Sequence, residues 1–392
     1  MGIKTIFGLP GGYVLKIYDV MPSYAKKINH ILTRHEQAAT HMADGFSRAS
    51  GLPGIILCTS GPAATNTITG ISTAYADSVP VLIFTGQVPT PFLGSDAFQE
   101  ADHIGITRTC TKHNTLVRKT IDLPKAIAEA LYISNTGRKG PVLVDMPKDV
   151  LIGESTFNFP KSVKISSYDD NIKLKNTEYK NFINAFKISK KPLFILGRGA
   201  CSSDSQKHMR KILKKFKSPA LTSILALGLI SGSEYNCGVL DYDSSSISKN
   251  LIEESDLIIS IGCDLSKIIN IKKLQNKLVA NINIDKVDLN VLNGSDINLH
   301  SDSSEFMKIL SDENQIDFDW TDNEISEIRN NYKININTVA PGAINTQMLD
   351  ISKEPMEVAP TAHYSMGGIL VNPVDHRTCL LYTSPSPRDK RQ

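Results

Sequence analysis

Short apolar runs alternate with segments of helical period along the first 150 residues, and this alternation limits the possible folds more than any other feature. The runs are too apolar for a sheet with one face in water, so we expect a parallel sheet covered on both faces. In Glu36–Ser50, apolar residues recur at the spacing of one helix face. The expected strands are Thr5–Phe7, Ile31–Leu32, Gly54–Thr59, Val79–Thr85 and Val142–Asp145.

A second series of the same kind follows a polar stretch and predicts a second open parallel sheet. Its expected strands are Pro192–Leu196, Ala220–Ser223, Leu257–Ile261 and Val279–Ile284. The sequence thus predicts an α/β chain with domains at 1–155 and 191–332, joined by a linker with a lead-in helix at 156–190. Beyond about 332 the periodicity fails, and the polar, Pro-rich tail at 333–392 is predicted to be disordered.

Composition excludes several classes of partner. The 392 residues carry 43 basic and 40 acidic side chains, a net charge of +3 that gives no reason to expect nucleic acid or a membrane surface. The basic run Lys207–Lys217 is interpreted as the solvated face of a helix. No apolar run approaches the roughly 20 residues of a membrane span. Six cysteines without C-x-x-C spacing fit free thiols in a reducing compartment. A cytoplasmic protein is expected, or a plastid or mitochondrial one in a eukaryote.

The chemistry-bearing residues lie in loops that we expect at the carboxyl ends of the strands, where open α/β sheets bind ligands. Glu36, in RHEQAA, would begin a helix, where a lone carboxylate usually just complements the helix dipole. Gly11 and Gly12 follow the first strand, at a turn where the backbone needs close approach or positive φ. The further loops are TSGPAATN (59–66), FTGQVPTP (84–91), GSDAFQEAD (94–102), TKHN (111–114) and GRKGPVLVDMPKDV (137–150).

Taken in order, these segments resemble the pyrimidine-binding domain of thiamine-diphosphate enzymes, and within them the acetolactate synthase family. The resemblance is close over about 3–150 and weaker on to about 330. It implies two Rossmann-like domains and a decarboxylative condensation of pyruvate with a second 2-keto acid, a step in making branched-chain amino acids. It also implies a homodimer and a regulatory small subunit.

The resemblance also assigns residue roles within the first domain. Glu36 would hydrogen-bond the aminopyrimidine of thiamine diphosphate and promote loss of the cofactor's C2 proton, and Gln99 would lie near the reaction centre. Gly12, Pro62 and Asn66 would lie beside the pyrimidine ring. The substrate channel would contain Pro89, Phe98 and Lys148. For each of these, the plainer alternative is an ordinary loop or packing residue.

The second domain resembles the family's central domain, which binds FAD as a structural cofactor. Arg138 and Asp285 match positions that contact FAD, and Gly197 and Gly199 in GRGA follow an expected strand, where they could cradle part of a dinucleotide. A lone Gly-x-Gly is weak evidence. The chain also departs from the family, with GCDLSKII at 262–269 in place of an arginine-rich stretch and residues 238–243 in place of a Met-His pair. These departures place FAD binding in doubt.

Other departures concern the site and the ends of the chain. Tyr13 replaces a usual alanine and Ala63 a usual glycine. We find no Gly-Asp-Gly motif for magnesium and the diphosphate, so the chain is expected to hold no metal and to be inactive as written, truncated at Met1 and after about 332. Segments 334–350, 354–372 and 379–389 resemble a short-chain dehydrogenase, a succinate dehydrogenase flavoprotein and a sequencing adapter, so we expect a chimeric tail.

Three alternatives remain open at this point. The chain could belong to another thiamine-diphosphate carboligase or decarboxylase; of these, glyoxylate carboligase lacks the glutamate and sulfoacetaldehyde acetyltransferase is less well matched by SDAFQEAD. It could be a non-catalytic, dimerising α/β module. The tail segments alone would suggest an oxidoreductase, but neither brings its cofactor-binding fold.

Overall fold

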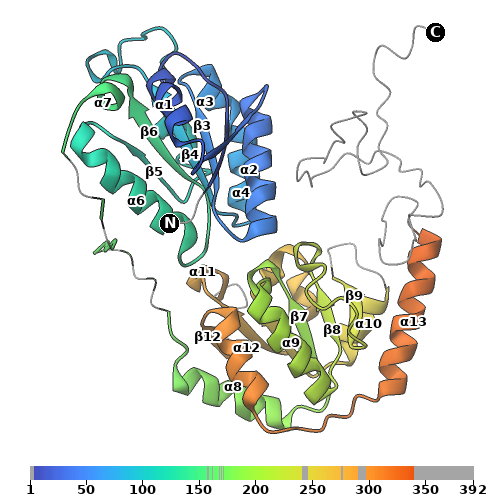
Figure 1. Cartoon of the computed structure of the whole chain (residues 1–392). Coiled ribbons are helices and arrows are strands. Elements are labelled where there is room, and N and C mark those ends of the chain that lie inside the picture. Colours follow the sequence, from blue (N-terminus) through green and yellow to red (C-terminus); the bar gives the residue numbers. More distant parts are fainter. Residues whose placement is uncertain are drawn as a thin grey trace, which may run out of the picture. The chain divides into compact units, whose positions relative to one another are not determined.

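The computed structural model describes residues 4–156, 159–160, 162–166, 168, 170, 172–240, 246–274, 277–289 and 297–339. These residues form two compact units, one ending at Asp170 and the other containing the described residues from 172 onward. Each unit is built on one six-stranded sheet (Figure 1). Of the tail predicted at 333–392, residues 333–339 complete a helix and the remainder lies outside the described residues.

The first unit is a parallel sheet in the order β2-β1-β3-β4-β6-β5. Its strands are β1 (Thr5–Gly8), β2 (Asn29–Leu32), β3 (Gly54–Cys58), β4 (Val81–Gln87), β5 (His113–Leu116) and β6 (Val142–Pro147). Its helices are α1 (Leu15–Val20), α2 (Glu36–Ser50), α3 (Pro62–Asn66), α4 (Ile68–Ala76), α5 (His103–Thr107), α6 (Leu123–Asn135) and α7 (Lys148–Ile152). The prediction of α2 is confirmed at both ends.

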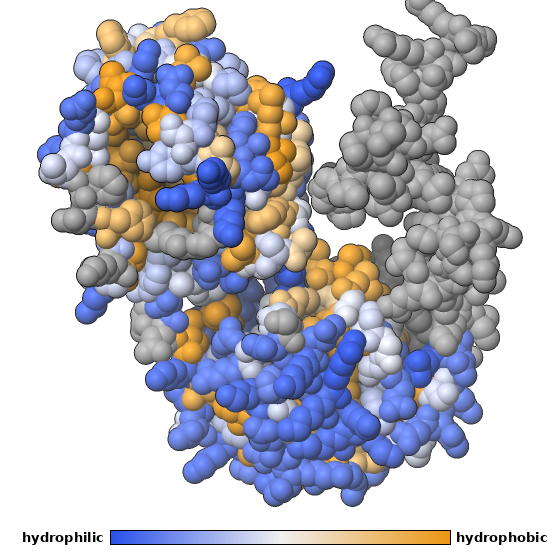
Figure 2. Space-filling model, viewed as in Figure 1, coloured by the Kyte–Doolittle hydropathy of each residue, from blue (hydrophilic) through white to orange (hydrophobic). Residues whose placement is uncertain are grey.

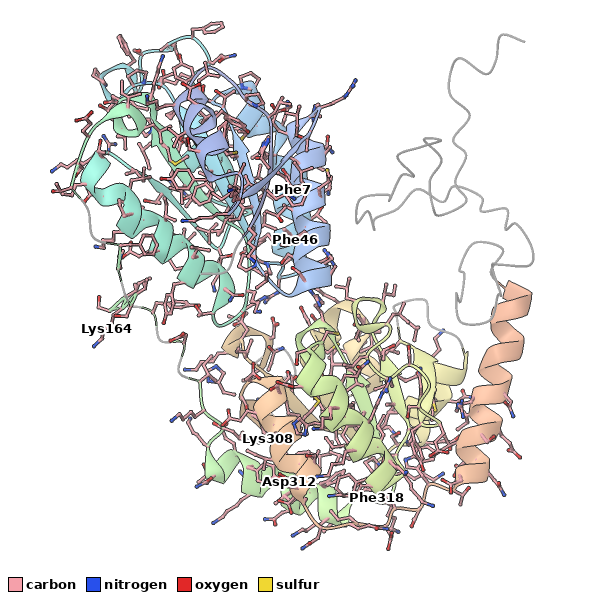
Figure 3. All side chains as sticks on the ribbon, in the orientation of Figure 1. Phe7, Phe46, Lys164, Lys308, Asp312 and Phe318 are labelled. Atoms are coloured by element: carbon pink, nitrogen blue, oxygen red, sulfur yellow. The ribbon has the colours of Figure 1, made fainter. Side chains whose placement is uncertain are left out.

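Alternating side chains of the central strands enter two separate cores, which is why these strands are apolar throughout. Ile55 and Leu57 of β3 pack with α1 and α6 on one face, whereas Ile56 packs with α2 and α4 on the other. On that second face Phe7 and Phe46 meet edge to face, with ring centroids 6.0 Å apart (Figure 3). The sheet is therefore covered on both sides, as predicted.

The second unit repeats the design in the order β12-β11-β10-β7-β8-β9, again all parallel. Its strands are β7 (Pro192–Leu196), β8 (Ala220–Thr222), β9 (Asn236–Val239), β10 (Leu257–Ile261), β11 (Leu278–Asn283) and β12 (Ile297–His300). Its helices are α8 (Asn176–Ile188), α9 (Ser203–Phe216), α10 (Ser246–Glu254), α11 (Lys286–Leu289), α12 (Ser303–Asp312) and α13 (Asp322–Val339).

The core of the second unit contains a cluster of aromatic side chains. Phe186 of α8 contacts Phe194 of β7 and Phe216 of α9, with ring centroids 6.2 and 5.1 Å away. The lead-in helix expected within 156–190 is therefore part of this core. The prediction that the basic run Lys207–Lys217 is the solvated face of a helix is also confirmed. Met209 and Leu213 of α9 are buried, and the side chains that face solvent include Lys207, Lys211 and Lys214. Figure 2 shows the resulting hydrophilic surface.

Candidate active site at the carboxyl edge of the first sheet

The strand order of the first sheet reverses at β1, which has β2 on one side and β3 on the other. Chain connections leave in opposite directions at such a point and open a crevice beyond the carboxyl ends of the strands. The loops after β1 and β3 border this crevice and are joined there, because the Tyr13 N–H donates to Thr59 Oγ1 at 3.1 Å. Gly11 is needed for this contact, since a Cβ atom on it would lie 2.4 Å from the Thr59 side chain.

Glu36 begins α2 and turns its side chain inward at this crevice. It is only 7% exposed, and its Oε2 accepts a hydrogen bond from Asn66 Nδ2 at 3.0 Å. The helix itself is capped by His35, whose ring nitrogen accepts from the Gln37 N–H. Among the described residues Oε1 of Glu36 has no hydrogen-bond partner. This oxygen is not fully buried, so a ligand can reach it, and an unpaired carboxylate oxygen suits a ligand that carries a hydrogen-bond donor.

Two further ionisable side chains lie close to Glu36, and both stay protonated at neutral pH. Burial raises the pKa of the Cys58 thiol, and the charges of Glu36 and Asp145 raise it further. Burial also raises the pKa of the Tyr18 hydroxyl, with smaller contributions from Cys58 and Glu36. Neither group can therefore act as a base beside Glu36.

The loop between β4 and α5 carries Gln99 to the same edge. Gln99 has φ of +61°, which is uncommon for a residue with a side chain. Its backbone packs on Gly61, where an added Cβ would lie 2.5 Å from the Gln99 carbonyl oxygen. Backbone N–H groups of Gly94 and Ala97 donate to the Glu100 carboxylate, and these bonds, with that of Gly94 the largest cause, lower the pKa of Glu100. The loop is thus internally braced around Gln99.

Two of the three expected channel residues, Phe98 and Lys148, lie next to Tyr13. The Tyr13 hydroxyl donates to the Phe98 carbonyl oxygen at 2.8 Å, and Lys148 Nζ lies 5.9 Å from the centre of the Tyr13 ring. The Phe98 side chain itself is 81% exposed. Pro89 precedes Thr90, whose N–H and hydroxyl both donate to the Asp149 carboxylate. Phe98, Pro89 and Lys148 therefore lie at the edge that carries Glu36.

Gly12 and Pro62 also lie at this edge, both exposed. The expected close approach of the backbone to a neighbouring segment is found at Gly11 but not at Gly12, since a Cβ atom on Gly12 would meet nothing within 4 Å. Pro62 is the first residue of α3, the short helix that ends with Asn66. Eight of the residues assigned by resemblance thus share one edge: Gly12, Glu36, Pro62, Asn66, Pro89, Phe98, Gln99 and Lys148.

Arg138 lies elsewhere. It is in the turn before β6, at the amino edge of the sheet, and its Nε donates to Ser78 Oγ at 2.9 Å in the turn before β4. The TKHN segment also lies at the amino edge, because β5 begins at His113, opposite the start of β6 at Val142. The expectation that every such segment follows a strand is therefore wrong for TKHN and for the start of the 137–150 segment.

The second sheet has an equivalent reversal of strand order between β7 and β10, but the glycines there serve backbone packing. A Cβ atom on Gly197 would lie 2.2 Å from the Gly262 carbonyl oxygen, and the Gly199 N–H donates to that oxygen at 2.9 Å. Asp285 accepts from the Val287 N–H and so caps α11. These contacts account for Gly197, Gly199 and Asp285 without a dinucleotide, so the structure gives no independent support for FAD.

A buried polar group beneath the crevice was missed by the sequence analysis. His103, 2% exposed, contacts Asp145, 1% exposed, with Nδ1 to Oδ1 at 2.9 Å. Asp145 also accepts from Thr85 Oγ1 at 2.7 Å and from Gln87 Nε2 at 3.0 Å. Polar residues in otherwise apolar strands were the available signal, since Thr85, Gln87 and Asp145 all lie on the face of the sheet that carries α2.

Among the described residues, no group of three or more His, Cys, Asp or Glu side chains is placed to hold a metal ion. In the same residues, no helix combines the length and apolarity needed to cross a membrane.

Comparison with known families agrees with this architecture. Residues 1–106 match the thiamine pyrophosphate enzyme N-terminal TPP binding domain, and residues 180–310 match the thiamine pyrophosphate enzyme central domain. The two matches together span more than half of the chain. The chain therefore belongs to the thiamine pyrophosphate enzymes and carries two of their domains in the usual order.

Among individual proteins, the chain is similar to acetolactate synthase large subunits. It is 40% identical over 313 residues to that of Buchnera aphidicola from Schizaphis graminum, which is 78% of this chain and 55% of the relative. It is 39% identical over 326 residues to that of Lactococcus lactis, 82% of this chain and 56% of the relative. It is 36% identical over 322 residues to the Escherichia coli isozyme 3 large subunit. The chain thus spans about half the length of these relatives.

Proposed function

We propose that the crevice of the first unit binds the aminopyrimidine half of thiamine diphosphate, and that the protein carrying these domains condenses pyruvate with a second 2-keto acid. The observation that carries the proposal is the buried Glu36 carboxylate, with one oxygen held by Asn66 and the other without a partner among the described residues. The similarity to acetolactate synthases supports the choice of reaction.

The residues present fit the cofactor's polar ring edge. When bound, thiamine diphosphate supplies a carbon acid whose conjugate base can attack a keto group. Glu36 would share a proton with the ring nitrogen that faces it, and Asn66 would fix the direction of the carboxyl group. Gln99, whose backbone packs on Gly61, would orient a substrate carboxylate or carbonyl. Lys148 would add positive charge near the anionic 2-keto acid.

The relatives suggest partners as well. They are named large subunits, so a smaller companion subunit is proposed for this protein. A homodimer is proposed on the family resemblance alone. FAD and magnesium form no part of the proposal, because the described residues show no site built for either.

Binding to the 392-residue chain is the first test. Isothermal calorimetry should detect thiamine diphosphate, and Glu36→Gln should weaken binding about tenfold or more, since a charge-assisted hydrogen bond is lost. Glu129→Gln is the matched control, because Glu129 lies partly exposed on α6 in an ion pair with Lys125, away from the crevice loops. Equal affinities for wild type and Glu36→Gln would contradict the proposed role.

Turnover is the second test. Because the chain spans about half the length of its relatives, it is assayed after fusion to the remaining length of the Lactococcus lactis protein. Acetolactate should form from pyruvate, in preference to products from glyoxylate or sulfoacetaldehyde. Glu36→Gln should lower kcat about 100- to 10,000-fold, the usual range for a group that moves a proton. A preference for glyoxylate or sulfoacetaldehyde would favour a different carboligase.

A further inference from the structure

His103 links the buried strands of the first unit to the loop that borders the crevice. Its imidazole lies at the start of α5, beneath the turn after β3. Nε2 accepts a hydrogen bond from the Gly61 N–H at 3.0 Å, and Nδ1 lies 2.9 Å from Asp145 Oδ1. Both ring nitrogens therefore have partners, and both contacts are buried.

These contacts fix the proton on the ring. A backbone N–H can only donate, so Nε2 must carry a lone pair, and the proton resides on Nδ1, which donates to Asp145. Asp145 is itself held as an acceptor, because Thr85 Oγ1 and Gln87 Nε2 donate to its two oxygens. Gln87 is fixed in turn, since its Oε1 accepts from the Val88 N–H at 2.9 Å. The imidazole is thus held in one orientation by two rigid central strands.

Gly61 depends on this acceptor. Its φ of +58° and ψ of −119° are open to glycine almost alone, and it precedes α3 without any side chain capping that helix. The Gln99 backbone lies directly against it, so it cannot shift toward that loop. Without the His103 nitrogen, the Gly61 N–H would be buried and unpaired. Because a buried unpaired N–H costs free energy, we expect the Gly61 turn to move until this group finds a new acceptor.

The position of Gly61 is transmitted to Glu36. Gly61 leads directly into α3, whose last residue is Asn66, and the Asn66 amide donates to Glu36 Oε2. We propose that His103, oriented by Asp145, is a positioning residue that places the Gly61 turn and thereby the Asn66 amide against Glu36. This inference rests on the proposed function, because it assigns His103 to the same site.

Two variants of His103 distinguish a hydrogen bond that anchors the Gly61 turn from a side chain that merely fills the space beneath it. The side-chain oxygen in His103→Gln reaches about as far as Nε2 and can accept from the Gly61 N–H. The side chain in His103→Asn reaches only as far as Nδ1, so it can contact Asp145 but not Gly61. Both variants are uncharged and polar, and both remove the ring, which makes each the control for the other.

The first readout is amide hydrogen exchange at Gly61 in the ligand-free chain. We expect at least tenfold faster exchange in His103→Asn and exchange within about threefold of wild type in His103→Gln. The second readout is thiamine diphosphate affinity, which should fall about tenfold in His103→Asn and recover largely in His103→Gln. Equal behaviour of the two variants in both readouts would overturn the proposal.

A measurement on the wild-type chain keeps the proposal testable if a variant fails to fold. Imidazole 15N chemical shifts at neutral pH should show His103 protonated on Nδ1 alone, and a proton on Nε2 would overturn the proposal. The two proposals also fail differently. A wild-type chain that binds no thiamine diphosphate would contradict the proposed function, while Gly61 exchange would still test the anchor. Binding that is equal in wild type and His103→Asn would contradict the positioning role alone.

Discussion

The two sheets share a layout, yet their carboxyl-edge crevices are built in opposite ways. In each unit the strand order reverses beside the first strand, β1 or β7. At the first crevice buried polar side chains converge, with Asn66 against Glu36 and His103 beneath Gly61. At the second, glycines bring one backbone directly against another. The topology provides a crevice in both units, and the side chains decide which one can hold a polar ligand.

The largest effect on stability is expected from a comparison of two glycine substitutions, one beside each crevice. Gly262 has φ of +57°, and a Cβ atom there would lie 2.5 Å from the Gly199 carbonyl carbon, whereas Gly12 faces open space. Gly262→Ala should therefore destabilise the second unit by about 3 kcal/mol, from backbone strain plus overpacking. Gly12→Ala should cost less than about 0.5 kcal/mol. Urea unfolding measures both, and similar costs would remove the proposed difference between the crevices.

A smaller effect is expected at Asp285, which the family resemblance links to FAD but the structure uses as a helix cap. Asp285→Ala should lower stability by about 1 kcal/mol, while Asp285→Asn should largely retain it because asparagine also caps helices. Thiamine diphosphate affinity should remain unchanged in both. If FAD stabilised the wild-type chain and Asp285→Asn abolished this stabilisation, Asp285 would be more than a helix cap.

The sequence predicted the central strands well and the edge strands poorly. β7 and β10 begin and end where predicted, because strands buried on both faces are continuous apolar runs. The edge strands β5, β9 and β12 were not predicted at all, and β2 only in half. An edge strand buries less surface and tolerates polar residues such as His113 and Asn114, so its sequence resembles that of a loop.

The site divides in a similar way. Glu36 and its neighbours could be found because their segments match a known family in order, although Glu36 itself follows the edge strand β2. The pairing of Asn66 with Glu36 could not, since it depends on how far α3 turns after Gly61. The Tyr13 contact with Phe98 joins residues 85 positions apart through side-chain geometry that no local pattern encodes. His103 was missed because a single histidine carries no information about its partners.

The two units should respond alike to acid. Burial alone would raise the pKa of Asp256, but hydrogen bonds from the Lys190 N–H, the Ser189 hydroxyl and the Lys191 N–H together hold that pKa below its usual value. A lowered folded-state pKa adds stability above the ordinary value of about 4, and this stability is lost as pH falls through the lower folded value. Asp256→Asn should cost about 1 kcal/mol at pH 7, since the side chain is partly solvated, and should flatten the decline below pH 4.

Asp149 provides the matching test in the first unit. There Thr90 donates twice to the carboxylate and, against the opposing effect of burial, lowers the pKa of Asp149. Asp149→Asn should flatten the acid decline of the first unit and leave the second unchanged. Chemical unfolding between pH 2.5 and 7, followed by hydrogen exchange in each unit, separates the two contributions. A decline that is unaltered in either variant would show that other carboxylates govern it.

The smallest expected effect tests whether a single hydroxyl links the loop at 94–100 to the turn after β1. Tyr13→Phe removes only the hydrogen bond to the Phe98 carbonyl oxygen, and because that bond is exposed the cost in stability should be about 0.5 kcal/mol or less. Amide exchange across 94–100 should nevertheless accelerate, since the loop loses its link to the turn after β1. Tyr24→Phe is the matched control on an exposed tyrosine. If both variants leave exchange in 94–100 unchanged, the bracing by Glu100 alone holds the loop, and Tyr13 acts only through the volume of its ring beside Lys148.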